Sequence, residues 1–175
     1  MRWQWRWPRR KNGRVGLVVI VMGVSGAGKT TVAAHLAQEL GWEFLDADSF
    51  HSAANVAKMY AGIPLDDADR TPWLKALRRE IARAIQQRRN LTLACSALKD
   101  AYRQQLVVGP EVRLVYLKGT FDVLRQRLVH RSGHFMTERL LASQLEALQE
   151  PADAITVDAQ QPVADIVAEI HRHLF

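Results

Sequence analysis

Apolar runs alternate with amphipathic segments from residue 15 to the end of the chain. Short apolar runs predict strands at residues 15–22, 43–45, 91–95, 112–117 and 154–157. Segments with apolar positions three or four residues apart predict helices at residues 29–40, 53–60, 72–88, 101–107, 121–131, 137–149 and 163–173. In the third of these helices, Leu74, Leu77, Ile81 and Ile85 form one apolar stripe. Pro72 fits its first turn, where a missing N–H costs little.

This alternation predicts an α/β fold with a central five-stranded parallel sheet and helices on both faces. Ligands of such sheets bind at the carboxyl ends of the strands. No repeat or linker divides residues 15–175, so we expect one domain there, preceded by a separate extension at residues 1–14.

The net charge of +6 comes from this extension, which holds six basic residues and no acid. The remaining 18 basic residues equal the 18 acidic ones, so the charge of the body gives no support to nucleic-acid binding. Trp3, Trp5 and Trp7 alternate with basic residues, a pattern also found in peptides that bind membrane surfaces. We favour a disordered extension without membrane contact, because short basic ends rarely have a fixed role.

Cys95 is the single cysteine, which excludes an intramolecular disulfide and suits a reducing compartment such as the cytoplasm. No apolar run approaches the length needed to span a bilayer. We therefore expect a cytoplasmic protein in which Cys95 is a small buried apolar residue.

Residues 23–30 fit the phosphate-binding pattern G-x-x-x-x-G-K-[ST] between a predicted strand and a predicted helix. The loop reads Gly23-Val24-Ser25-Gly26-Ala27-Gly28-Lys29-Thr30. Its backbone N–H groups and the start of the helix suit a polyphosphate. We expect Lys29 to reach the β- and γ-phosphates of a nucleoside triphosphate and the Thr30 hydroxyl to contact Mg²⁺.

Two acids follow the second predicted strand at positions 46 and 48, and a histidine follows at position 51. Side chains two residues apart at a strand end point the same way. One of Asp46 and Asp48 could hold Mg²⁺ through water while the other accepts a proton from a hydroxyl acceptor. An N-cap for the next helix is the alternative, and it accounts for one acid only.

Polar residues also begin abruptly after the third predicted strand. Lys99 and Arg103 are four residues apart, so on a helix they would share a face and suit an anionic substrate. An ordinary solvated helical face is the alternative.

Residues 125–139 are rich in arginine and contain a glycine at position 133. Arg127 and Arg131 therefore predict a mobile lid that neutralises charge on a transferring phosphoryl group and excludes water. A solvated basic helix is the alternative.

Together these segments resemble gluconokinases of the small P-loop type, within the group that includes shikimate and adenylate kinases. The resemblance runs from about residue 15 to residue 175. It rests on MGVSGAGKT, FLDADSFH, PLDDADRTPWL, CSALK, YLKG, RSGHFM and VDAQQP in this order. The first motif is generic, whereas the second, third and fourth together are specific.

The resemblance implies a three-layer P-loop NTPase fold with a helical lid, acting as a homodimer. It implies phosphorylation of D-gluconate to 6-phosphogluconate with ATP and Mg²⁺. The loop at residues 158–162 would flank the adenine through Gln161. The implied substrate contacts are Asp48, His51, Lys58, Arg70, Lys99, Arg103 and His134. Departures from the family pattern, at Ala27, Thr30, Ser52 and Thr137, remove no charged group.

Overall fold

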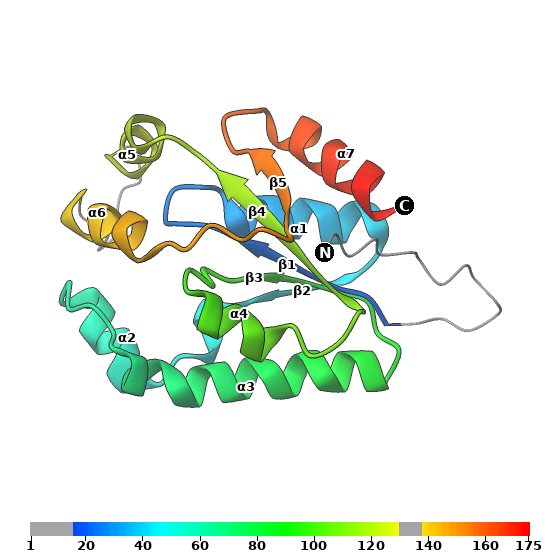
Figure 1. Cartoon of the computed structure of the whole chain (residues 1–175), viewed down its shortest axis with the longest axis horizontal. Helices are drawn as coiled ribbons and strands as arrows, with labels where there is room; N and C mark the ends of the chain where they lie inside the picture. Colours follow the sequence, from blue (N-terminus) through cyan, green and yellow to red (C-terminus); the bar gives the residue numbers. More distant parts are fainter. Residues whose placement is uncertain (1–15, 130–137) are drawn as a thin grey trace.

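The computed structural model describes residues 16–129 and 138–175. Its centre is a parallel sheet with the strand order β2-β3-β1-β4-β5, which confirms the predicted five-stranded parallel sheet (Figure 1). The strands are β1 (Val18–Met22), β2 (Glu43–Asp46), β3 (Leu91–Ala94), β4 (Val112–Lys118) and β5 (Ile155–Asp158).

Helices cover both faces of this sheet, as predicted. The helices are α1 (Lys29–Leu40), α2 (Ala53–Tyr60), α3 (Asp67–Gln86), α4 (Asp100–Leu106), α5 (Phe121–Val129), α6 (Glu138–Ala147) and α7 (Val163–Leu174), with a 3₁₀ turn η1 (Ala47–Phe50). Helices α1 and α7 lie on one face and α3 and α4 on the other, while α2, α5 and α6 lie beyond the carboxyl ends of the strands (Figure 1). None of the described helices is long and apolar enough to cross a membrane.

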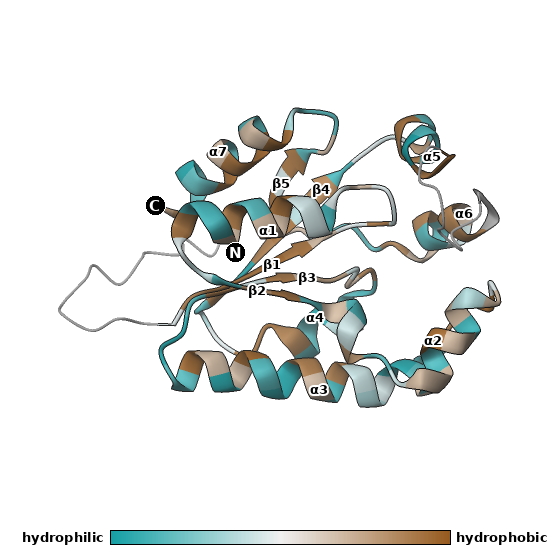
Figure 2. Ribbon diagram, turned by 180° about the vertical axis from the view of Figure 1, so that it is seen from behind, coloured by the Kyte–Doolittle hydropathy of each residue, from teal (hydrophilic) through white to brown (hydrophobic). Residues whose placement is uncertain are grey.

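The central strand β1 is buried at every position, because both of its faces are covered. Val19 and Val21 belong to the core under α1 and α7, whereas Val18, Ile20 and Met22 belong to the core under α3 and α4. Largely brown, apolar strands lie between helices that carry both teal and brown residues (Figure 2). The alternation of side chains along one strand therefore supplies both cores.

Helix α3 begins earlier than the apolar stripe predicts. It starts at Asp67, and Asp66 caps it through a reciprocal capping box with Asp69. Pro72 therefore lies inside the helix, so its predicted place in the first turn is wrong. The capping box of residues 66–69 sets the start of the helix. Pro72 is tolerated inside the helix because it removes only one backbone hydrogen bond.

Candidate active site

Three segments that leave neighbouring strands meet at the carboxyl edge of the sheet. The phosphate loop follows β1, the acid-rich segment follows β2, and residues 95–99 follow β3. The backbone N–H of Gly23 donates to the carbonyl of Ser96 at 3.4 Å, which joins the first segment to the third. The sheet order thus brings together segments that lie far apart in the sequence, such as those of Gly23 and Ser96.

The backbone of the phosphate loop favours glycine at two positions, Gly26 and Gly28. Gly26 has a φ of +83°, and a Cβ there would lie 2.9 Å from the carbonyl oxygen of Leu124. Gly28, with a φ of +92°, is the N-cap of α1, so the first N–H groups of that helix face the loop. The Lys29 ammonium donates to the carbonyl of Val24 at 3.1 Å and lies across the loop. This cradle of N–H groups and one cation fits a polyphosphate.

Asp46 uses its two carboxylate oxygens differently. One accepts a hydrogen bond from the Thr30 hydroxyl at 2.8 Å, and the other accepts from the backbone N–H of Asp48 at 3.0 Å and caps η1. Hard oxygen donors of this kind suit Mg²⁺, which needs only one or two protein ligands when phosphates supply others. No cluster of three or more metal-binding side chains occurs among the described residues. The Thr30–Asp46 pair is therefore a candidate holder of Mg²⁺ on the chemistry of its oxygen donors.

His51 is held by α3. The Trp73 indole N–H donates to the carbonyl of Ala47 at 2.7 Å, and the His51 ring stacks on Trp73 with centroids 4.7 Å apart and an interplanar angle of 7°. Burial lowers the pKa of His51 below its ordinary value of 6.5, against the opposing effect of the Asp48 carboxylate. Its Nδ1 is shielded from solvent and has no hydrogen-bond partner among the described residues.

A cavity of about 340 Å³ is lined in part by Trp73, the residue on which this histidine stacks. Its lining comes from the 50–55 segment and the start of α3: Phe50, Ser52, Asn55, Ala68, Asp69, Pro72 and Trp73. The cavity is large enough for a small polyol, and its lining includes both hydroxyl and carboxylate groups.

The predicted substrate cations are paired with acids from α3. The Lys58 ammonium lies 2.7 Å from the Asp69 carboxylate, and the Lys99 ammonium lies 2.8 Å from that of Asp67. These hydrogen bonds raise the pKa of each lysine and lower the pKa of each aspartate. Sequence reasoning missed Asp67 and Asp69 as partners, although both lie in the motif PLDDADRTPWL.

Tyr102 joins this group from α4. Its hydroxyl donates to the Asp67 carboxylate and accepts from Arg70 at 3.3 Å. Arg70 therefore lies near Lys99 and Asp67, at the edge of the same site. Lys99 and Tyr102 thus share the Asp67 carboxylate, and Arg70 joins them through the Tyr102 hydroxyl.

Arg103 differs from its prediction. The side chain is 5% exposed and donates to the carbonyls of Ala97 at 3.0 Å and Leu98 at 2.9 Å. Lys99 is the N-cap of α4, so it precedes the helix and does not share a helical face with Arg103 as expected. Arg103 instead stabilises a loop in which Ala97 has a φ of +43°. Its described bonds support a positioning role for this arginine.

Cys95 is buried as predicted, and burial raises the pKa of its thiol to about 12. A thiol that stays protonated at neutral pH is a poor nucleophile. Cys95 therefore serves as a small apolar residue of the core.

Arg127 connects α5 to the loop after β5, because its guanidinium donates to the carbonyl of Ala159 at 2.7 Å. In that loop, the Gln161 carboxamide donates to Glu169 at 3.2 Å. Gln161, which is expected to flank the adenine, is thus close in the sequence to Ala159, the partner of Arg127. The predictions for Arg131, His134 and the centre of the lid lie outside the described residues, as does the extension at 1–14.

Sequence reasoning missed Gln144 on α6. The backbone N–H of Ser25 in the phosphate loop donates to the side-chain oxygen of Gln144 at 2.8 Å. The two residues are 119 positions apart, so no local pattern could have identified the pair.

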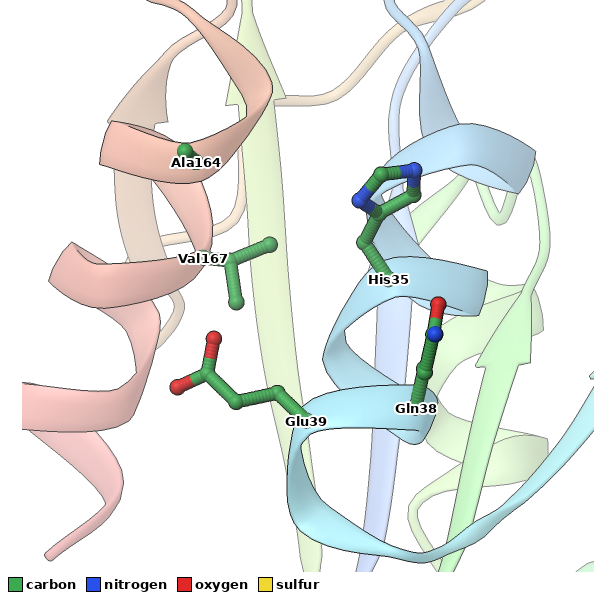
Figure 3. Close-up of a pocket in the computed structure, with 5 residues that line it drawn as sticks. All are labelled: His35, Gln38, Glu39, Ala164 and Val167. Atoms are coloured by element: carbon green, nitrogen blue, oxygen red, sulfur yellow. The ribbon is translucent and has the colours of Figure 1, made fainter.

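A second cavity, of about 420 Å³, lies between α1 and α7 (Figure 3). It is lined by His35, Gln38, Glu39, Ala164 and Val167. None of the predicted site residues lines it, and Figure 3 shows Glu39 extending from α1 toward α7. This cavity is therefore separate from the site at the strand ends.

Comparisons with known proteins agree with this geometry. A family profile described as an AAA domain matches residues 18–151. The thermoresistant gluconokinase of Escherichia coli (strain K12) is 45% identical over 157 residues, covering 86% of this chain and 89% of that protein. The gluconokinase of Gluconobacter oxydans (strain 621H) is 42% identical over 160 residues, covering 89% of each.

Among solved structures, a gluconokinase from Sinorhizobium meliloti 1021 superposes with a TM-score of 0.79 at 40% identity, covering 90% of both chains. The shikimate kinase of Bacteroides thetaiotaomicron superposes with a TM-score of 0.66 at 17% identity over 90% of this chain and 98% of that one, which shows a shared fold. Together with the phosphate loop, the strand order and the acid-rich segments, these likenesses show that the chain belongs to the gluconokinase family of P-loop kinases.

Proposed function

We propose that this protein transfers the γ-phosphoryl group of ATP to the 6-hydroxyl of D-gluconate. The observation that carries the proposal is the meeting of a phosphate cradle with paired acids and cations at one sheet edge. Relatives named as gluconokinases, at 40–45% identity, support gluconate as the acceptor.

On the donor side, the loop N–H groups and Lys29 would bind the phosphates, and Thr30 with Asp46 would hold Mg²⁺. When bound, the metal spreads the charge of the phosphates. Arg127 and Arg131 would neutralise further charge from the lid, and Gln161 would contact the adenine. Lys29 would also orient the terminal phosphate toward the acceptor.

On the acceptor side, Asp48 would accept the proton of the 6-hydroxyl. Asp46 already uses its two oxygens for Thr30 and the Asp48 N–H, which leaves the carboxylate of Asp48 for the substrate. Lys99, Lys58 and Arg70 would bind the gluconate carboxylate and hydroxyls, with His51 stacked on Trp73 of the cavity lining. Arg103 would act through the loop that presents Lys99.

The test is Lys29→Ala in a coupled assay of ADP formation with gluconate. Because Lys29 supplies charge that the transition state requires, we expect turnover to fall by roughly 10²–10³-fold. Lys75→Ala on the exposed side of α3 is the matched control and should retain activity. Near-normal turnover of Lys29→Ala would contradict the proposal.

A panel of acceptors tests the substrate. We expect the highest kcat/KM with gluconate, and lower values with shikimate, neutral polyols and nucleoside monophosphates. A nucleotide or shikimate as the best acceptor would overturn the choice of gluconate but not the phosphoryl transfer.

The family resemblance also supports a homodimer acting in the cytoplasm. Sedimentation equilibrium of the full chain measures its assembly. A monomer at micromolar concentration would remove the dimer from the proposal without affecting the chemistry.

A further inference from the structure

The phosphate loop and helix α6 share a hydrogen bond that phosphate chemistry would break. The N–H of Ser25 donates to Gln144 Oε1 at 2.8 Å, a strong geometry for an N–H to oxygen bond. A backbone N–H can only donate, so the carboxamide must present its oxygen to the loop. A phosphate oxygen would present the same chemistry to the same N–H.

Ser25 lies inside the sequence G-x-x-x-x-G-K-[ST], whose backbone N–H groups bind phosphate oxygens. One N–H has a single hydrogen and makes one well-aligned bond. Gln144 and a nucleotide phosphate therefore compete for it. The Gln144 oxygen carries only a partial charge, so a charged phosphate oxygen makes the stronger bond and displaces it.

We infer that Gln144 is an internal competitor that occupies the Ser25 N–H when nucleotide is absent and is displaced by the triphosphate. Gln144 lies on the first helix after the predicted lid, so its release removes the hydrogen bond between α6 and the phosphate loop while Leu141 of α6 stays packed in the core with Val24 and Ala27. The inference rests on nucleotide binding by the loop, which is part of the proposed function.

The chain just beyond α6 is bonded to residues 98–100, around Lys99, and not to the phosphate loop. Gln149 accepts from the N–H of Asp100 at 2.6 Å, and its own N–H donates to the carbonyl of Leu98 at 3.0 Å. The same side-chain type therefore makes a comparable bond on the same segment without touching the phosphate loop. Gln149 supplies a matched control.

The experiment compares Gln144→Leu with wild type in calorimetric titrations with a non-hydrolysable ATP analogue. Leucine keeps the size and helix propensity of glutamine but cannot accept a hydrogen bond. We expect the Kd for the analogue to fall by roughly threefold to tenfold, the worth of one ordinary hydrogen bond. Adenosine, which lacks phosphates, should bind both proteins equally, and Gln149→Ala should bind the analogue like wild type.

Hydrogen exchange of the Ser25 amide gives a readout that does not depend on activity. Without nucleotide, the amide should exchange faster in Gln144→Leu than in wild type. Faster exchange with an unchanged or higher Kd for the analogue would show that the contact is structural, and unchanged exchange would show that it does not form in solution. Either result overturns the inference.

These outcomes are distinct from failure of the proposed function. If wild type does not bind the ATP analogue, the proposed function fails. If wild type and Gln144→Leu bind it equally, only the role of Gln144 fails.

Discussion

At the scale of single residues, Asp46 and Asp48 lie two positions apart and make different contacts. Asp46 is bonded to the Thr30 hydroxyl of the phosphate loop and to the N–H of Asp48. It therefore links the phosphate loop to the acid-rich segment that follows β2. One oxygen caps the 3₁₀ turn η1 while the other faces Thr30, whereas Ser52 caps the predicted helix α2, so the Mg²⁺ role of Asp46 stays a prediction. The backbone N–H of Asp48 donates to this cap, so Asp46 fixes the position of Asp48.

Asp48→Asn should lower kcat on gluconate by about 10²–10⁴-fold with little change in KM, because an amide cannot accept the hydroxyl proton. Steady-state kinetics in gluconate measure both values. Asp46→Asn is the comparison, and it should mainly raise the Mg²⁺ concentration needed for half-maximal rate. A rise in KM alone for Asp48→Asn would assign this acid to binding.

At the scale of elements, the N-terminus of α3 organises the acceptor side. Its first turn supplies the capping box and the acids that hold Lys58 and Lys99, while Trp73 in its second turn fixes η1 and stacks on His51. Negative side chains at a helix N-terminus also interact favourably with its dipole. The cap therefore stabilises the helix and places three parts of the site.

Asp66→Ala should reduce the free energy of unfolding by about 1 kcal/mol, since the N–H of Asp69 loses its cap. Urea denaturation measures this change. Asp66→Asn keeps an oxygen that accepts the same bond and should retain most of the stability. Equal losses in both variants would show that charge, and not the cap, stabilises this turn.

At the scale of the whole molecule, acid should weaken the fold in two stages. His51 has a pKa below its ordinary 6.5, so the folded state favours the neutral ring, and this stability is present above pH 6.5 and falls as pH drops through the folded pKa. Asp67 and Asp69, with pKa values below the ordinary 3.8, add a second loss at lower pH.

We expect the unfolding free energy of wild type to decrease as pH falls from 7 toward 5, and to decrease less in His51→Gln. Urea denaturation at each pH measures this slope. His173→Gln, at an exposed site on α7, controls for removal of a histidine. An identical slope in wild type and His51→Gln would contradict the role of this ring.

The fold followed from local patterns to a large extent. Helices α1 and α2 have the predicted bounds, and the strand ends differ from the prediction by at most three residues, because periodicity and helix caps act within a few residues. The start of α3 was missed because its cap lies before the apolar stripe that was used to locate it.

The sequence by itself determined the strand–helix alternation, the phosphate loop and the family motifs, since each depends on neighbouring residues. Only the tertiary structure decided which distant residues meet. Asp67 pairs with Lys99, and Ser25 meets Gln144. These contacts depend on the strand order β2-β3-β1-β4-β5, which places distant loops at one edge of the sheet. Local periodicity sets the direction in which a side chain points from its element, whereas strand order sets its neighbours.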